Sequence, residues 1–530
     1  MPSPIIADAA TRPYTSADEV AAAHAALVRT FAAGRTKDLR WRKWQLKQLW
    51  WMFDDNERAI AQALALDMGR PELEARVEVA QVKAEILLHL DHLEEWAADE
   101  PVREAGFLLG TLGGARVRRE PRGVALLIGA WNMPFKVTLA PLVAAVSAGC
   151  CAVVKPSELA VASQNIMADL AARYLDPEAV RVVTGGAAET GGILELPFDH
   201  VFYTGSGRVG RLVAAAAARH LTPTVMELGG TNPAVVTASA DVDLAAKRIA
   251  FAKRALAGQI CTTVNHIFAD PAVHDELVER LAYWTRELCK DDEGRLQEVS
   301  QTVSERHYER VTRLLESTKG TVHRAHEPDS KRNLIAPTTV SDIGPDDPIM
   351  SEELFAPVCA VLKATCQEAV AKINSKDRAE INYILDNTSS GGVTINDTFF
   401  HGLVEGAPFG GVGGSGHGYY HGKHGVREFT YQRAVVEIPL WLEPLLSSRY
   451  SLAADKNPMS QLVKLPRGRR FRRGETLQDQ VVGQRGPSAP VKLALVIAVV
   501  GVVGSQLFPA KIGRFHGFAR WLEATVRAWL

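Results

Sequence analysis

The amino-acid sequence predicts an α/β protein with more than one domain. Short apolar runs alternate with helical patterns between residues 124 and 219, and a second alternation of the same kind begins after Gly230. A chain of 530 residues is also long enough to bury several hydrophobic cores. We therefore expect helices packed on parallel β-sheets.

The composition is that of an ordinary globular protein, with 23% charged and 47% apolar residues. The 60 basic and 61 acidic side chains nearly cancel, so the overall charge does not indicate a nucleic-acid partner. The cysteines do not have the spacing of a zinc site, and we expect neither a disulfide framework nor a metal site; they are Cys150, Cys151, Cys261, Cys289, Cys359 and Cys366. Residues 1–13 lack the pattern of a secretory signal.

The first third of the chain predicts helices followed by an extended segment. Residues 15–96 carry apolar side chains every three or four positions, and Ser16 is a suitable N-cap. A basic segment at 116–120 reads as extended. The apolar run 124–128 is bounded by glycines and reads as a buried strand.

The first alternation then continues to residue 219. We expect helices at 139–148, 163–174 and 209–219 and strands at 152–154, 180–184 and 200–203. The last strand enters a glycine-rich turn that contains Gly205, Ser206, Gly207 and Gly210. Backbone N–H groups at such a helix start can bind pyrophosphate, although the glycine spacing alone is weak support. Its position between a strand and a helix favours a dinucleotide-binding sheet.

The second alternation predicts another set of elements. Strands are expected at 234–237, 266–268 and 335–340, and helices at 244–257, 273–288 and 304–316.

Two short stretches contain side chains suited to covalent catalysis. Glu227 lies in an apolar stretch before two glycines, where a buried carboxylate can act as a general base. Cys261 follows a Gly-Gln turn that could hold a nucleophilic thiol. Taken singly, each residue is better explained as a solvated charge or a small buried side chain.

Five further motifs along the chain favour the catalytic interpretation of Glu227 and Cys261 over the ordinary one. They are Trp131-Asn132-Met133-Pro134-Phe135, Val154-Lys155-Pro156-Ser157-Glu158, the turn after Thr204, Glu352-Glu353-Leu354-Phe355 and Pro408-Phe409-Gly410-Gly411. With these motifs, residues 15–437 resemble the aldehyde dehydrogenase superfamily, most closely its class 3 or fatty aldehyde dehydrogenase branch. The histidine-rich stretch 417–424 resembles a tight turn of that family rather than a metal cluster.

The resemblance implies a role for each matched residue. Cys261 would attack the aldehyde, Asn132 and the Cys261 N–H would stabilise the oxyanion, and Glu227 would activate water. The expected cofactor is NAD, with NADP possible. Its binding residues would be Trp131, Gly205, Ser206 and Gly210, with Lys155 and Glu158 at the adenosine ribose and Glu353 and Phe355 at the nicotinamide ribose and ring.

The resemblance also implies the domain organisation. We expect an NAD(P)-binding domain at 15–227 and a catalytic domain at 228–405. A small β oligomerisation element would use 111–123 and part of 388–440, with strands near 391–395 and 427–437. The protein would be a homodimer.

One stretch departs from the family pattern. Between residues 373 and 387 the chain is shorter than expected and lacks a strand of the catalytic sheet. An inactive membrane-attached protein, or a mis-spliced variant, is therefore an alternative. A relative that forms acyl-CoA or takes semialdehydes is another, although we identify no cationic anchor for a charged substrate in the sequence.

The C-terminal region has a different composition. Residues 441–490 read as a basic linker and 491–530 as a membrane-anchor tail, because 493–508 is almost wholly apolar. Basic residues before the run would lie on the cytosolic side of an internal membrane and attract anionic lipid. A tail helix folded onto the enzyme or its dimer partner is the alternative; the protein would then be cytoplasmic.

Overall fold

The computed structural model describes residues 12–105, 107–291, 293–294, 299–365, 373–374, 377–443, 447–450 and 478. The chain divides into two units, Met1–Ile438 and Pro439–Leu530. The predicted linker lies mostly outside the described residues, and the predicted tail at 491–530 lies wholly outside them. In the described parts of the chain, no helix has the length and apolarity needed to cross a membrane.

In the part of the chain that the structure describes, four α-helices precede the first sheet, as the helical pattern of the sequence predicts. They are α1 (Ala17–Ala32), α2 (Leu39–Asp54), α3 (Glu57–Met68) and α4 (Glu72–Ala97). The predicted cap of α1 is confirmed, because the Ser16 hydroxyl accepts the Glu19 N–H at 3.3 Å. In return, the Glu19 carboxylate accepts the Ser16 N–H at 2.8 Å.

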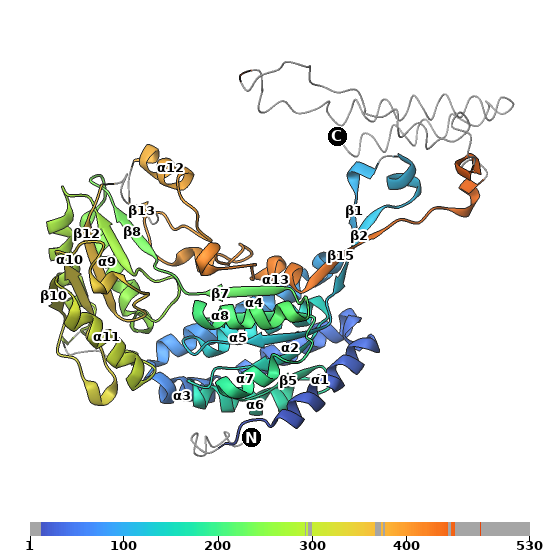
Figure 1. The fold of residues 1–530 in the computed structure, drawn as a ribbon, viewed down its shortest axis with the longest axis horizontal. Helices are drawn as coiled ribbons and strands as arrows, with labels where there is room; N and C mark the ends of the chain where they lie inside the picture. The colour runs from blue at the N-terminus through green and yellow to red at the C-terminus, as the bar shows by residue number, and fades with distance from the viewer. Residues whose placement is uncertain are drawn as a thin grey trace. The chain divides into compact units, whose positions relative to one another are not determined.

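The first sheet has the order β14-β7-β6-β3-β4-β5, and all its strands except β14 are parallel. The helices between its strands cover both faces (Figure 1). The strands are β3 (Val124–Ile128), β4 (Cys151–Lys155), β5 (Val180–Val182), β6 (His200–Gly205), β7 (Thr224–Leu228) and β14 (Gly416–His417). The helices are α5 (Pro134–Ala148), α6 (Val161–Tyr174), α7 (Ala187–Ile193) and α8 (Gly207–Arg219).

The side chains of strand β3 are buried on both faces of the first sheet. Ala125 and Leu127 pack with α2 to α6, whereas Leu126 and Ile128 pack with α1, α7 and α8. Because successive side chains of a strand point to opposite faces, a continuous apolar run is required here.

Several boundaries differ from the sequence prediction. Helix α5 begins at Pro134 rather than residue 139, because the Glu78 carboxylate of α4 accepts the N–H groups of Phe135 and Lys136. Helix α8 begins two residues early because the Ser206 hydroxyl caps it. Helix α6 begins at Val161 rather than residue 163, and strand β5 ends at Val182 rather than residue 184.

The second sheet has the order β10-β11-β12-β9-β8-β13, in which only β10 is antiparallel. Helices α9 (Val242–Arg254) and α10 (His274–Glu287) pack on one face, and α11 (Glu305–Ser317) packs on the other. The strands are β8 (Pro233–Val236), β9 (His266–Ala269), β10 (Thr321–Arg324), β11 (Thr338–Ser341), β12 (Val358–Lys363) and β13 (Ile373–Asn374).

Two boundaries in this part also differ. Helix α9 ends at Arg254 rather than residue 257, because Leu256 and Ala257 both have φ of 50° and leave the helical region. Strand β11 begins at Thr338 rather than residue 335, directly after Pro337, whose nitrogen cannot donate to a sheet.

The stretch that is short relative to the family pattern lies at the edge of this sheet. In the described residues, Ile373 and Asn374 of strand β13 pair with Val235 and Val236 of β8. Helix α12 (Arg378–Asp386) follows, and its Ile381 and Ile384 belong to a small apolar cluster with Val235. This cluster buries apolar surface beside the short edge strand.

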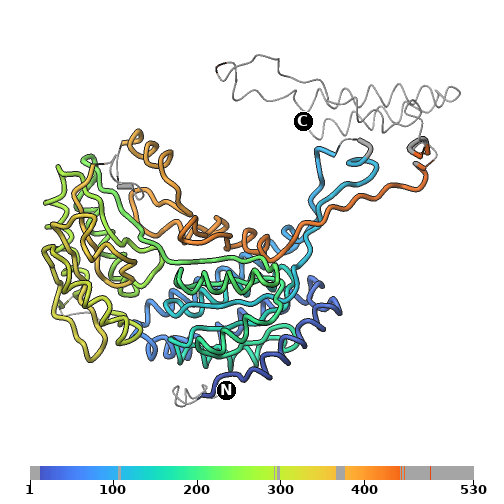
Figure 2. The backbone as a smooth tube through the Cα atoms, viewed as in Figure 1, coloured from blue at the N-terminus to red at the C-terminus, as the bar shows by residue number. Residues whose placement is uncertain are grey.

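A third sheet joins distant parts of the chain. It contains β1 (Glu100–Pro101), β2 (Arg116–Pro121) and β15 (Thr430–Val435) in that order. Figure 2 shows the orange segment with β15 running beside the light-blue segment with β2. Helix α13 (Gly422–Glu428) precedes β15.

The expected strand at 391–395 is wrong for this sheet. Gly391 instead packs against the backbone of Gly410, and a β-carbon at Gly391 would collide with the Gly410 carbonyl oxygen. The oligomerisation role of the third sheet, and the domain boundaries, stay predictions.

Candidate active site

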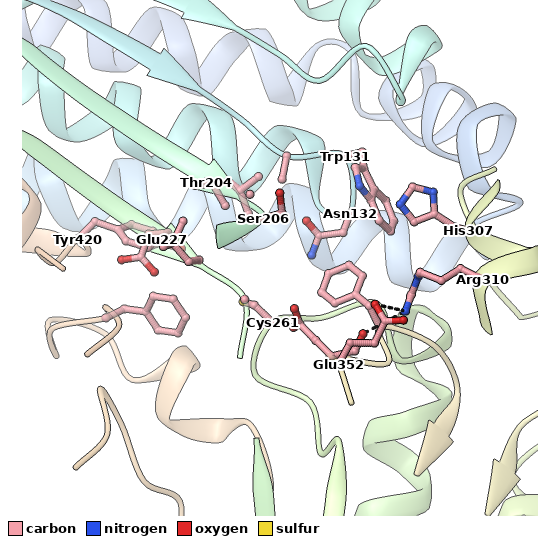
Figure 3. Close-up of a pocket in the computed structure, with 18 residues that line it drawn as sticks. Trp131, Asn132, Thr204, Ser206, Glu227, Cys261, His307, Arg310, Glu352 and Tyr420 are labelled. Atoms are coloured by element: carbon pink, nitrogen blue, oxygen red, sulfur yellow. Dashed lines mark hydrogen bonds and ion pairs between the residues drawn. The ribbon is translucent and has the colours of Figure 1, made fainter. Parts of the chain in front are cut away.

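Loops from both large sheets meet around a cavity of about 280 Å³. Figure 3 shows Asn132, Glu227 and Cys261 approaching one another from three separate segments. Eight of the predicted site residues line this cavity: Trp131, Asn132, Gly205, Ser206, Glu227, Cys261, Glu353 and Phe355. Lys155, Glu158 and Gly210 do not line it.

The loop before Cys261 has an unusual backbone. Leu256, Ala257 and Gly258 have φ of 50°, 50° and 68°, so two residues with side chains occupy the left-handed region. Such a conformation persists only where the surrounding structure enforces it. A β-carbon at Gly258 would collide with the Ala356 carbonyl oxygen, which explains the glycine at this position.

Hydrogen bonds from Gln259 help to hold the left-handed backbone at 256–258 in place. Its buried amide donates to the carbonyl oxygens of Leu256 at 2.9 Å and Gln301 at 3.0 Å. Cys261 lies two residues after Gln259, and its carbonyl oxygen accepts a hydrogen bond from the Asn232 side-chain amide at 2.5 Å. The backbone on both sides of the thiol is therefore fixed by side-chain hydrogen bonds.

Asn132 is buried, and its side-chain amide donates to the Gln259 carbonyl oxygen at 2.9 Å. An amide has two N–H groups, so a second donor remains on the same nitrogen. The Asn132 carbonyl oxygen accepts a hydrogen bond from Arg70, which also forms a buried ion pair with Glu78. Because Glu78 in turn caps α5, this network holds Asn132 beside the Cys261 loop.

Glu227 lies near the end of β7, and its Oε1 is buried without a hydrogen-bond partner among the described residues. Burial raises the pKa of this carboxyl well above its usual value. A carboxylate without a competing donor can accept a proton from a bound molecule.

The thiol of Cys261 is protonated at neutral pH in this arrangement. Burial, together with the nearby carboxylates Glu227 and Glu353, raises its pKa to about 12, against the opposing effect of Lys136. Nucleophilic attack therefore requires removal of the thiol proton by a base.

The glycine-rich turn lies at the start of α8. The Ser206 hydroxyl accepts the Val209 N–H at 3.4 Å, and a β-carbon at Gly207 would contact nothing within 4 Å. The space before the first helical turn is thus open, which fits a pyrophosphate group at a helix N-terminus. At the end of β4, the Lys155 ammonium donates to the Glu158 carboxylate at 2.8 Å.

An aromatic wall and a partly buried carboxyl complete this side of the cavity. The Trp131 ring packs against Phe355 at 5.3 Å and against His307 at 5.4 Å between centroids. Phe355 has φ of 46°, a left-handed conformation that is uncommon for an aromatic residue. Burial raises the pKa of the Glu353 carboxyl to about 7.

A second cavity, of about 340 Å³, also reaches Cys261 and Asn132. Its walls are mainly apolar; they include Leu73, Val77, Phe251, Ile260, Phe399, Phe400, Leu403 and Tyr420. In the described residues, five side chains line both this cavity and the first one: Asn132, Val137, Cys261, Phe409 and Tyr420. The thiol therefore lies where a cavity with several polar lining groups, among them Glu227 and Arg310, meets a mainly apolar one.

Some lining residues were not predicted from the sequence. Arg310 donates to the carbonyl oxygens of Glu353 at 3.2 Å and Leu354 at 2.6 Å and lies 3.4 Å from the Glu352 carboxylate. It lies in helix α11, which reads only as a charged helix in the sequence. Tyr420 lies in the histidine-rich turn, whose pattern carries no sign that it enters a cavity.

Comparisons with known proteins agree with this geometry. Residues 7–435 match the model of the aldehyde dehydrogenase family. The dimeric NADP-preferring aldehyde dehydrogenase of Rattus norvegicus is 37% identical, over 81% of this chain and 96% of that protein. Aldehyde dehydrogenase family 3 member A2 of Rattus norvegicus is 38% identical, over 77% and 86%.

A solved structure shares the fold. The substrate-bound AldH of Staphylococcus aureus superposes with a TM-score of 0.77 at 29% identity, covering 84% of this chain and 98% of that one. The predicted α/β class and the predicted class 3 branch are thereby confirmed.

Proposed function

The chain belongs to the aldehyde dehydrogenase family, and from this premise we propose that it oxidises medium- and long-chain aldehydes to carboxylic acids. The family assignment makes the protein an oxidoreductase that acts on aldehydes and uses NAD(P). The observation that carries the proposal is the mainly apolar cavity that ends at Cys261. An apolar wall stabilises an alkyl chain by removing it from water.

The reaction begins at the sulfur atom. A water molecule takes the proton of the Cys261 thiol, and the thiolate attacks the carbonyl carbon of the aldehyde. The resulting oxyanion receives hydrogen bonds from the Asn132 amide and the Cys261 N–H. When bound, NAD(P) supplies the acceptor for the hydride that leaves the thiohemiacetal carbon. The residues Trp131, Gly205, Ser206, Glu353 and Phe355 would hold it. A thioester on Cys261 remains.

Glu227 completes the cycle. Its carboxylate takes a proton from water, and the resulting hydroxide attacks the thioester carbon. The carbon–sulfur bond then breaks, which releases the carboxylic acid and regenerates Cys261.

Asn132→Ala is expected to lower the rate of acylation by about 10²- to 10³-fold, because one of two oxyanion donors is lost. NADH formation in the first turnover measures this step. Nucleotide binding, followed by fluorescence, should be unchanged, since the Asn132 side chain acts on the aldehyde oxygen. An equal loss of nucleotide binding would instead indicate a collapsed loop.

A chain-length series tests the substrate class. Each added methylene should raise kcat/KM by about 4-fold until the cavity is filled, because burying a methylene contributes about 0.8 kcal/mol. The measurement is NAD(P)H formation with straight-chain aldehydes of increasing length. Rates that fall or stay level from the shortest aldehyde onward would reject the fatty-aldehyde proposal.

NAD is the proposed preferred nucleotide. The Glu158 carboxylate, one-third exposed beside Lys155, would repel the additional phosphate of NADP if it contacts the adenosine ribose. The ratio of kcat/KM for the two nucleotides tests this, and a ratio that favours NADP would reject it.

A homodimer is proposed because the rat relative is named as dimeric. The third sheet, with the exposed Tyr431 of β15 and the exposed Val436 directly after it, is the proposed contact. Light scattering of the purified protein measures the mass, and a monomeric mass would exclude the dimer.

Membrane association through the C-terminal region is proposed from the apolar run 493–508 and the basic residues before it. Truncation after Arg485 should move the protein from the membrane pellet to the soluble fraction while activity is retained. Equal partition of the two forms would reject the anchor.

A further inference from the structure

The apolar cavity contains a cation that the proposed mechanism does not use. Lys136 lies in the first turn of α5, four residues after Asn132, and lines the cavity that ends at Cys261. It is only partly exposed, and its ammonium is close enough to Cys261 for the two groups to influence each other's pKa. The charge therefore lies near the reactive end of the cavity.

The carboxylates around Lys136 are occupied by other donors. Glu78 forms an ion pair with Arg70 through Oε2 and accepts two backbone N–H groups through Oε1. Glu85 accepts the Gly422 N–H at 2.8 Å through the oxygen that lies 3.1 Å from His89. Across the described residues, the Lys136 ammonium has neither an ion pair nor a hydrogen bond.

An unpaired cation in a mainly apolar cavity is unfavourable, because desolvation penalises its charged form. Burial accordingly lowers the pKa of Lys136. An anion that enters the cavity would remove this penalty and gain a charge-assisted hydrogen bond. An unpaired charge beside a reactive group is for this reason a sign of a binding function.

In the resting enzyme, Cys261 is not the anion that pairs with the Lys136 ammonium, because its thiol is protonated. The pKa of the thiol is raised to about 12 even with Lys136 nearby, because burial and two carboxylates outweigh the lysine. A second cationic side chain, Arg254, lines the same cavity. The buried Oε1 of Gln81, another lining residue, accepts no hydrogen bond from the described residues. The polar groups of this cavity thus favour a ligand that is not purely hydrocarbon.

We infer that Lys136 binds a carboxylate carried by the aldehyde, so that the enzyme also oxidises short oxo-acids to dicarboxylic acids. This inference rests on the proposed aldehyde oxidation at Cys261 and adds a second substrate class at the same site. It also supplies the cationic anchor that was not evident in the sequence. The bonds formed and broken are those already given, and only the anchoring of the substrate differs.

The test compares two aldehydes of equal length, hexanal and 6-oxohexanoate. Lys136→Met should lower kcat/KM for 6-oxohexanoate by about 10-fold or more, mainly through KM, because a hydrogen bond to a charged group is lost. The kcat/KM for hexanal should fall less, because only the effect of Lys136 on the Cys261 thiol is lost, so the ratio of the two kcat/KM values is the readout. Lys136→Arg should restore most of the lost specificity, and Lys47→Met, which removes an exposed lysine of α2, is the matched charge control.

Other outcomes would overturn the inference. An equal fall for both aldehydes would mean that Lys136 acts on the reaction at Cys261 and not on the carboxylate. Unchanged values for both would mean that it binds neither. Binding of adipate, the product, is measured by calorimetry as a readout that does not need turnover. Adipate that binds wild-type protein and not Lys136→Met supports the carboxylate site at Lys136 even if neither aldehyde is oxidised. The missing oxidation would then reject the proposed function and, with it, the oxo-acid substrate.

Discussion

Replacing Cys261 with serine is expected to lower kcat for aldehyde oxidation by at least about 10⁴-fold, because the covalent intermediate can no longer form efficiently. A serine hydroxyl is a much weaker nucleophile than a thiolate and ionises far less readily. The side chain is nearly isosteric, and the loop is held by hydrogen bonds from Gln259 and Asn232, so the fold should persist. Steady-state NADH formation measures the effect.

The matched control is Cys289→Ser. Cys289 is buried, and among the described residues it is not part of the lining of the cavities around Cys261 given above. Its replacement should leave turnover near the wild-type value. If Cys261→Ser retains more than a small fraction of wild-type turnover, the nucleophile is another group. The same experiment addresses the alternative of an inactive protein, since that alternative predicts no turnover in the wild type either.

Glu227→Gln should separate the two halves of the reaction. Acylation and hydride transfer would continue, so one equivalent of NADH forms per active site in a rapid burst. Hydrolysis of the thioester should then slow by about 10²- to 10⁴-fold, because no carboxylate takes the proton from water. Stopped-flow NADH formation and mass spectrometry of the acylated Cys261 peptide measure the two steps. A steady-state rate equal to wild type would remove Glu227 from the role of base.

The pH dependence follows from the buried position of this carboxyl. General-base catalysis needs the ionised form, whose population grows as the pH rises through the pKa. Because burial raises the pKa of Glu227, the deacylation rate should increase with pH over a range well above the usual titration of a glutamate. Glutamine does not titrate, so this increase should be absent in Glu227→Gln. An identical increase in both proteins would assign it to another group.

Much of the fold could be predicted from the sequence because its determinants are local. Strand β3 is a continuous apolar run, and the hydroxyl of Ser16 caps its own helix three residues away. The turn around Gly205 and Ser206 is recognisable because a strand precedes it and a helix follows. Motif order also predicted that Cys261, Glu227 and Asn132 belong to one site, and the structure brings them to the same cavity.

Other features depend on residues that are far apart in the sequence. Helix α5 begins at Pro134 because a carboxylate from α4 satisfies its first N–H groups, and no residue near Pro134 encodes that contact. The end of α9 is set by packing that holds Leu256 and Ala257 in a conformation unfavourable for both.

The sequence by itself therefore determined the α/β class, the order of the elements and the residues proposed to react, because periodicity, caps and motifs act over a few residues. Only the tertiary structure decided that Arg310 and Tyr420 line the site and that Lys136 faces a mainly apolar cavity beside Cys261. The reason is physical: a lysine in a helical first turn has the same local preferences whether it meets water or a buried cavity. Its surroundings come from α4, α9 and the loops after α12, which the chain brings together only on folding.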